Sequence, residues 1–214
     1  MKQITFYLDF ISPYACLAFE HLPRALEGVS YGVHYRPLLL GALFKHHDNT
    51  PPPQVPSKHQ WIGRHVLWLG HTHGIPIEMP ASHPYNPLPH LRLALATSHD
   101  GDISRDVAET IFRAVWRGGG EAIDPQRLAT LEQRLPCVHE ANGDAVKAQL
   151  KANTDAAIAA GVFGVPTFEV EGRLFWGFDS LPMLRACLEG DAWFSGPDWD
   201  AAPRRLAALR RPID

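Results

Sequence analysis

The chain has 214 residues, of which 45% are hydrophobic and 20% charged, and such proportions are typical of a globular protein rather than a disordered or fibrous one. Its length fits one large domain or a domain that carries an insertion. The net charge of -3 at pH 7 argues against nucleic-acid and anionic-membrane surfaces, because both partners require clustered lysine and arginine. We therefore expect small molecules as ligands, with neither nucleic acid nor membrane as partner.

The chain begins directly in a strand-like segment, without the apolar region and cleavage site of a signal peptide. No apolar stretch approaches the length of a transmembrane span. Its three cysteines, Cys16, Cys137 and Cys187, are not closely spaced. An odd, scattered set is typical of a reducing compartment rather than of a disulfide framework, so we expect a cytoplasmic protein.

The first part of the chain has the pattern of a strand, a helix and a second strand. Apolar and polar residues alternate in both predicted strands. Between them, Ser12 can cap a helix and Pro13 can occupy its first position. We predict a strand at 3–9, a helix at 14–26 and a strand at 29–38.

Proline, histidine, asparagine and glycine dominate residues 41–89, which predicts a long functional loop with one short helix at 61–69. A block of helices follows, each bounded by glycine or proline. A hairpin and a last helix, capped by Asp179 or Ser180 and running through Cys187, complete the pattern. The predicted helices are 87–98, 104–117, 125–135 and 144–160, and the hairpin strands are 167–170 and 173–176.

This order, βαβ then helices then ββα, predicts an α/β protein with a thioredoxin-like fold and a helical insertion domain. We expect a discontinuous thioredoxin-like domain at 1–40 and 161–195. The loop and helical insertion occupies 41–160, and a C-terminal tail occupies 196–214. The tail contains the only basic cluster, Arg204–Arg205 with Arg210–Arg211, which we interpret as a solvated face.

Two motifs carry the predicted chemistry. Ser12 lies at a strand-to-helix turn, where free backbone N–H groups and the helix dipole favour an anion such as a thiolate. Taken alone, Ser12 would more simply be a helix cap. Val165-Pro166 precedes a strand, and a cis peptide there would free the backbone of Val165 to pair with an extended ligand.

Together these motifs resemble the DsbA-like branch of the thioredoxin superfamily, specifically the 2-hydroxychromene-2-carboxylate isomerases and the kappa-class glutathione transferases. Redox members of the superfamily have Cys-x-x-Cys at the turn, whereas this chain has Ser12 and Ala15, so dithiol exchange is excluded. Cys16 lies one residue farther on, and we expect it to be buried. The matching segments are 12–15, 48–52 with Lys58, 74–76, 164–168 and 176–179.

The resemblance implies that glutathione supplies the reactive sulfur. Ser12 would donate a hydrogen bond to that sulfur and favour the thiolate, while Val165, before a cis Pro166, would pair with the cysteinyl backbone. Further glutathione contacts implied by the resemblance are Asp179 and the Phe178 backbone for the γ-glutamyl ammonium, and Asn49 and Lys58 for the remaining polar end.

The same resemblance implies an isomerase of aromatic catabolism in which glutathione adds to a chromene and is then eliminated, and a homodimer. We expect the aromatic substrate beside Ser12, in contact with Tyr85 and Asn86. The chain departs from the family pattern in having Ser180 in place of an arginine and Trp68-Leu69 in place of Arg-Trp. The substrate is therefore less defined than the cofactor.

Other functions stay open from the sequence. The 12 histidines raise a metal site as an alternative, but neither His46-His47 nor His71 with His73 can share a helical face, and no zinc motif accompanies them. We therefore predict no metal. The alternatives to the isomerase are a kappa-type glutathione transferase or peroxidase, and a non-catalytic glutathione- or peptide-binding module.

Overall fold

The computed structural model describes residues 1–199 and 201–202. The four arginines predicted as a solvated tail face, Arg204, Arg205, Arg210 and Arg211, lie outside these described residues. No helix among the described residues is both long enough and apolar enough to cross a bilayer.

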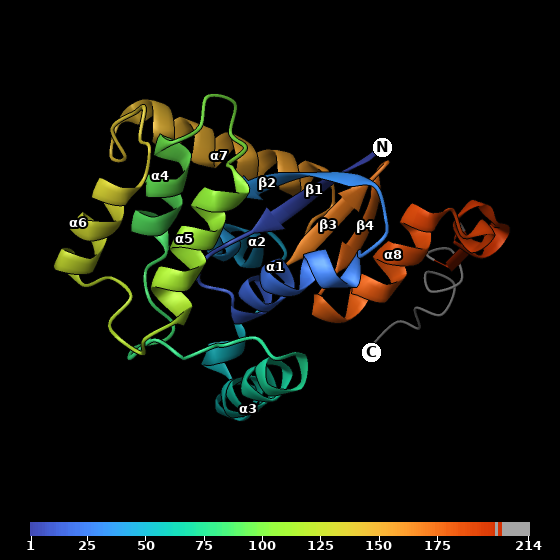
Figure 1. Ribbon diagram of the computed structural model, residues 1–214, viewed down its shortest axis with the longest axis horizontal. Coiled ribbons are helices and arrows are strands. Elements are labelled where there is room, and N and C mark those ends of the chain that lie inside the picture. Colours follow the sequence, from blue (N-terminus) through green and yellow to red (C-terminus); the bar gives the residue numbers. More distant parts are fainter. Residues whose placement is uncertain (200, 203–214) are drawn as a thin grey trace, which may run out of the picture.

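A four-stranded sheet forms the centre of the thioredoxin-like half, with the strand order β2-β1-β3-β4 (Figure 1). β1 runs parallel to β2, and Lys2 pairs with Tyr31 at the start of the register. β3 is antiparallel to both β1 and β4. The strands are β1 (Lys2–Leu8), β2 (Tyr31–Pro37), β3 (Thr167–Val170) and β4 (Arg173–Trp176).

Helices cover both faces of this sheet and build a separate block beside it (Figure 1). The α-helices are α1 (Pro13–Ala25), α2 (Leu40–His46), α3 (Pro56–His73), α4 (Leu88–Ala96), α5 (Arg105–Trp116), α6 (Pro125–Arg134), α7 (Asp144–Ala159) and α8 (Leu181–Glu189). The 3-10 helices are η1 (Pro52–Gln54), η2 (Phe178–Ser180) and η3 (Ala192–Ser195).

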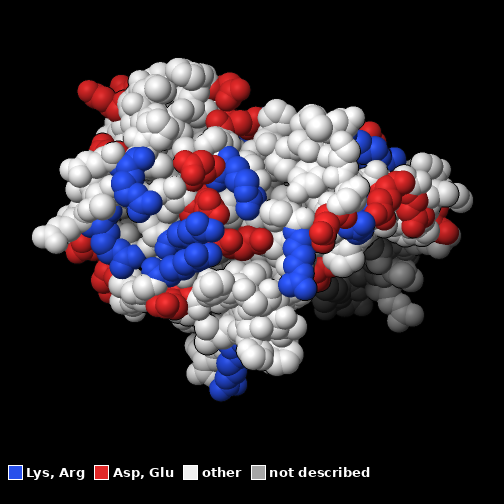
Figure 2. Space-filling model, in the orientation of Figure 1, with Lys and Arg blue, Asp and Glu red and all other residues white. Residues whose placement is uncertain are grey.

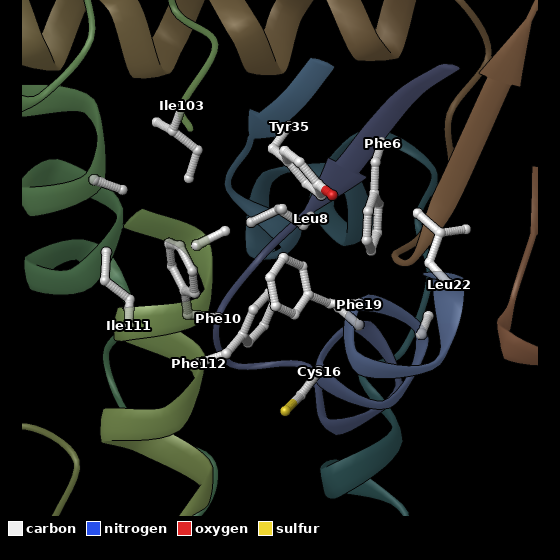
Figure 3. Close-up of a cluster of buried hydrophobic side chains, with 14 of the residues drawn as sticks. Phe6, Leu8, Phe10, Cys16, Phe19, Leu22, Tyr35, Ile103, Ile111 and Phe112 are labelled. Carbon is white, nitrogen blue, oxygen red and sulfur yellow. The ribbon is translucent and has the colours of Figure 1, made fainter. Parts of the chain in front are cut away.

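The larger core lies between the sheet, α1 and the helical block. Alternation along β1 directs Ile4, Phe6 and Leu8 into it, and all three are fully buried. Figure 3 shows Phe10 and Phe112 beside Phe19, where α1 meets α5, with ring centroids 4.9 and 5.3 Å from Phe112. This packing fixes the start of α1 against the helical block.

A smaller core lies on the opposite face of the sheet. Tyr7 points there from β1 and packs with Leu38, Leu43, Ala157, Val162 and Val165. Val162 and Val165 belong to the segment that leads into β3, so this core fixes the loop before that strand. α7 runs from this face to the helical block (Figure 1).

The α/β thioredoxin-like class predicted from the sequence is confirmed, and each predicted strand appears within two residues of its expected bounds. Two features differ from the long loop predicted at 41–89. The helix α2 was not predicted and starts at Leu40, and the short helix expected at 61–69 is the longer α3, Pro56–His73. α7 packs against β2 as well as α4, so it bridges the two domains we expected. The domain division itself stays a prediction.

Candidate functional site

The turn between β1 and α1 presents Ser12 at the exact start of the helix. The Ser12 Oγ accepts a hydrogen bond from the Ala15 N–H at 3.2 Å, and the Ser12 N–H donates to the Asp9 carbonyl at 3.1 Å. Pro13 fills the first helical position. The predicted N-cap is therefore confirmed, and it lies where the helix dipole favours a negative charge.

The segment before β3 faces this turn. The Ser12 hydroxyl is 3.4 Å from the Val165 carbonyl oxygen, which is long for an O–H···O hydrogen bond. The Val165–Pro166 peptide is cis, as the sequence predicted. The Val165 N–H makes no hydrogen bond within the described part of the chain. The Val165 N–H is thus available to an extended ligand, and the Val165 carbonyl accepts only the long contact from Ser12.

Buried polar groups on the inner side of the turn stabilise it through hydrogen bonds. Asp9 is fully buried, and its carboxylate accepts hydrogen bonds from the N–H groups of Ile11 at 3.2 Å and Leu40 at 2.9 Å. Burial raises the pKa of Asp9 to about 7, although these hydrogen bonds oppose the shift. The His83 Nε2 lies 2.9 Å from the Ile11 carbonyl oxygen, and the Trp116 indole N–H donates to the Phe10 carbonyl at 2.9 Å.

On its other side, the turn meets Tyr14, α3 and η2. The Tyr14 hydroxyl lies 2.9 Å from the His65 Nδ1, and the His65 ring stacks on Trp61 at a centroid distance of 5.9 Å. Burial, with a smaller contribution from the negative charge of Asp179, raises the pKa of Tyr14. Tyr14 therefore connects the start of α1 to α3 through His65.

The structure treats the two predicted η2 residues differently. Asp179 is exposed, whereas the Phe178 ring is buried and packs against the rings of His21 and His73 at 5.5 and 5.0 Å. The Phe178 carbonyl already accepts the Leu181 N–H. Of the pair expected at the γ-glutamyl ammonium, Asp179 is the exposed one.

Asn49 and Lys58 are both exposed and flank η1. The Asn49 N–H donates to the Phe44 carbonyl at 2.9 Å, and the Asn49 side chain makes no hydrogen bond with a residue that the structure describes. Lys58 lies in the first turn of α3. Within the described residues, no hydrogen bond or ion pair joins either side chain to Ser12, so their predicted roles stay predictions.

Tyr85 and Asn86 lie on the segment that leads into α4. Tyr85 is 8% exposed, and its hydroxyl is buried without a hydrogen-bond partner among the described residues. Burial, with smaller contributions from Asp9 and Cys16, raises its pKa well above the ordinary value. The phenol therefore points toward the interior behind the turn, while the exposed Asn86 binds the Leu88 N–H through its side-chain oxygen.

The thiol nearest to the turn is inert. Cys16 is 3% exposed, and Figure 3 shows its side chain directed into the helix-packed interior. Burial raises its pKa strongly, which suppresses the thiolate that disulfide exchange requires. The burial predicted for Cys16 is confirmed. Among residues 1–199 and 201–202, no three histidine, cysteine or acidic side chains gather in a way that could hold a metal ion.

Sequence reasoning missed several residues of the site. Asp9 could have been noticed as an acidic residue that ends an apolar strand three positions before Ser12. Tyr14 and His65 lie 51 positions apart, and no local pattern connects them. Phe163, whose exposed ring lies 4.9 Å from that of Trp176 between centroids, was likewise not singled out.

Comparison with known proteins agrees with this geometry. The chain is 28% identical to human glutathione S-transferase kappa 1 over 223 residues, covering 96% of this chain and 98% of the relative. It is 27% identical to the 2-hydroxychromene-2-carboxylate isomerase of Pseudomonas putida over 195 residues, covering 86% and 93%. Both relatives are enzymes.

Solved structures show the same fold. A 2-hydroxychromene-2-carboxylate isomerase superposes with a TM-score of 0.74 at 22% identity, covering 98% of this chain and 100% of that one. The cytosolic disulfide reductase DsbM from Pseudomonas aeruginosa with GSH gives a TM-score of 0.51 at 18% identity, covering 97% and 100%. The family model of the DsbA-like thioredoxin domain matches residues 3–189. This chain belongs to the DsbA-like thioredoxin domain family.

Proposed function

We propose that this protein is a glutathione-dependent isomerase of the 2-hydroxychromene-2-carboxylate type. The observation that carries the proposal is Ser12 at the N-terminus of α1, opposite Val165, whose N–H makes no hydrogen bond within the described residues. That arrangement offers a place for a thiolate and for the backbone of the peptide that bears it. Because the turn itself has no cysteine and Cys16 is buried, the sulfur comes from the ligand.

Ser12 acts on this sulfur as a hydrogen-bond donor. Its Oγ accepts from Ala15, which orients the oxygen, and its O–H has only the distant Val165 carbonyl as partner. A thiolate within reach offers a stronger, charge-assisted bond, so the hydroxyl turns toward it. The helix N-terminus adds to the stabilisation, as it does for low-pKa cysteines.

The parts of glutathione on either side of its thiol group contact different residues of the site. Val165, before Pro166, pairs with the cysteinyl backbone, and Asp179 takes the γ-glutamyl ammonium. Asn49 and Lys58 hold the other polar end. This assignment is supported by the exposure of Asp179 and of both polar side chains and by the unpaired N–H of Val165.

Isomerisation then follows from reversible addition. The thiolate forms a C–S bond with the chromene double bond, and the displaced electron pair opens the ring. Rotation occurs about the new single bond, and elimination breaks the C–S bond, restores the double bond and releases glutathione. The substrate is a small aromatic compound, and the protein acts as a cytoplasmic homodimer in aromatic catabolism.

Ser12→Ala tests this proposal, with Ser104→Ala as a matched control. Ser104 caps α5 in the same way, because its Oγ accepts a hydrogen bond from the Val107 N–H at 3.2 Å. Each substitution therefore removes one N-cap bond, with a cost in stability of about 1 kcal/mol. Isomerisation of 2-hydroxychromene-2-carboxylate with glutathione should fall at least tenfold in Ser12→Ala, because one charge-assisted bond is lost. It should be unchanged in Ser104→Ala.

Parallel assays separate the alternatives. Turnover of a halogenated aromatic but not of the chromene would identify a glutathione transferase. Glutathione binding without turnover, equal in wild type and Ser12→Ala, would identify a binding module. Reduction of insulin disulfides by the protein with dithiothreitol would contradict the assignment of the sulfur to glutathione.

A further inference from the structure

Two exposed aromatic side chains lie next to Val165, the residue proposed to pair with the backbone of the ligand. Phe163 is 41% exposed and Trp176 is 54% exposed, and their ring centroids lie 4.9 Å apart at an interplanar angle of 56°. The Trp176 indole also covers Gly164, because a Cβ on that glycine would lie 2.7 Å from the indole Nε1. The aromatic pair therefore borders the residue that directly precedes Val165.

The register of the sheet directs Trp176 away from α1. Tyr7 pairs with Thr167, and Thr167 pairs with Trp176. Paired residues of antiparallel strands point to the same face of a sheet. Tyr7 packs in the smaller core, on the face opposite to the larger core that contains α1. Trp176 and its partner Phe163 thus lie on the side of the sheet that faces away from α1.

An extended ligand that pairs with Val165 has side chains that alternate between these two sides. The cysteine of the ligand directs its sulfur toward Ser12, at the start of α1. The residues next to the cysteine therefore point to the opposite side, where the aromatic pair lies. A substrate bonded to the sulfur stays on the side of Ser12. The aromatic pair is accordingly accessible to the peptide and not to the aromatic substrate.

The residue that follows the cysteine is the one directed to the pair. The His47 Nε2 lies 3.2 Å from the Val162 carbonyl oxygen, which brings the end of α2 beside the residue that precedes Phe163. Asn49, proposed for the polar end of the ligand beyond the cysteine, follows two positions after His47. In glutathione the residue after the cysteine is glycine, which has no side chain to cover the two rings.

We infer that Phe163 and Trp176 form a subsite for the side chain of the residue after the cysteine. The protein then accepts thiol peptides in which this side chain is apolar or aromatic. The inference rests on the proposed function and extends its ligand from glutathione to this wider class of peptides. Two rings that meet at a tilt offer contact area to such a side chain, and backbone pairing at Val165 limits the ordering that its binding requires.

Other exposed tryptophans lie on a different element. Trp68 is 60% exposed and belongs to α3, and its ring lies 6.0 Å from that of His71 in the same helix. Figure 2 shows the projecting α3 segment as mostly uncharged. Trp68 therefore provides a control that matches Trp176 in size and exposure.

Calorimetric titration with S-methylated γ-glutamyl peptides tests the inference, because the blocked sulfur does not ionise. S-methylglutathione is compared with the analogue in which phenylalanine replaces glycine. For the wild type, we expect the Kd of the phenylalanine analogue to be about tenfold lower, because its ring buries apolar surface against Phe163 and Trp176. Phe163→Ala and Trp176→Thr should remove this difference, whereas Trp68→Ala should retain it. The ratio of the two constants in one protein cancels any general loss of affinity.

A third peptide tests the alternation. The S-methylated tetrapeptide with phenylalanine after the glycine directs its ring to the side of Ser12, so it should bind no more tightly than S-methylglutathione. Equal constants for the glycine and phenylalanine tripeptides in the wild type, or a ratio preserved in both Phe163→Ala and Trp176→Thr, would overturn the inference while leaving the glutathione site intact. A gain for the tetrapeptide equal to that of the tripeptide would also overturn it. Absence of binding of all three peptides by the wild type would instead contradict the proposed function itself.

Discussion

Asp9→Asn should change how the stability of the protein depends on pH. In the native state, burial raises the Asp9 pKa from 3.8 to about 7, while in the unfolded state the carboxyl has its ordinary value. Between these two values the native state binds more protons than the unfolded state. The free energy of unfolding of the wild type therefore falls as pH rises through this window.

The magnitude follows from the shift. About three pKa units at roughly 1.4 kcal/mol each give ~4 kcal/mol between pH 4 and pH 7. This free energy needs no reduction for solvent screening, since Asp9 is fully buried. Asparagine does not titrate, so the free energy of unfolding of Asp9→Asn minus that of wild type should increase by about 4 kcal/mol from pH 4 to pH 7. The substitution also removes a hydrogen-bond acceptor for the Leu40 or Ile11 N–H, but that cost is the same at every pH.

Urea unfolding at several pH values between 4 and 7 measures this difference. A difference for Asp9→Asn that is flat, or that decreases with pH, would refute the reasoning that burial dominates the Asp9 carboxyl.

Two further predictions concern the packing of α3 and the thiols. Gly70→Ala should destabilise the protein by about 1–3 kcal/mol in urea unfolding, because the added Cβ would lie 2.9 Å from the Ile75 carbonyl oxygen. Gly63→Ala, on the same helix with open space around it, should be neutral or stabilising by up to about 1 kcal/mol. Equal effects of the two substitutions would contradict the close packing at Gly70. With a thiol-specific chromogenic reagent, exposed Cys137 should react in the native protein and Cys16 only after unfolding; rapid native labelling of Cys16 would show that its burial is overestimated.

Local sequence patterns were sufficient for most of the fold. Alternation in β1 identified the buried face that contains Phe6, and Ser12-Pro13 marked the start of α1, because caps and N1 prolines act within a few residues. Val165–Pro166 was correctly expected to be cis. α2 was missed because Leu40–His46 is a short helix without a side-chain cap, inside a segment dominated by loop-forming residues.

Tertiary contacts decided the features that local patterns could not supply. Ser180 was expected as one of two caps for the last helix, and it does precede α8, but its hydroxyl bonds to the Gly177 carbonyl instead of capping the helix. Tyr85, expected at the substrate, is buried in the larger core, which joins residues from distant parts of the chain. The Tyr14 contact with His65 depends on how α3 packs against α1, which periodicity does not specify.

The central claim is that Ser12 and the start of α1 stabilise a thiolate that glutathione provides. Titration of the thiolate ultraviolet absorbance of bound glutathione tests it most directly, with wild type, Ser12→Ala and Ser104→Ala compared. The account predicts a glutathione thiol pKa at least one unit lower on wild type and Ser104→Ala than in free solution, since one unit equals about 1.4 kcal/mol, and a smaller decrease on Ser12→Ala. A bound thiol that titrates as free glutathione does, or a decrease equal in all three proteins, would contradict it.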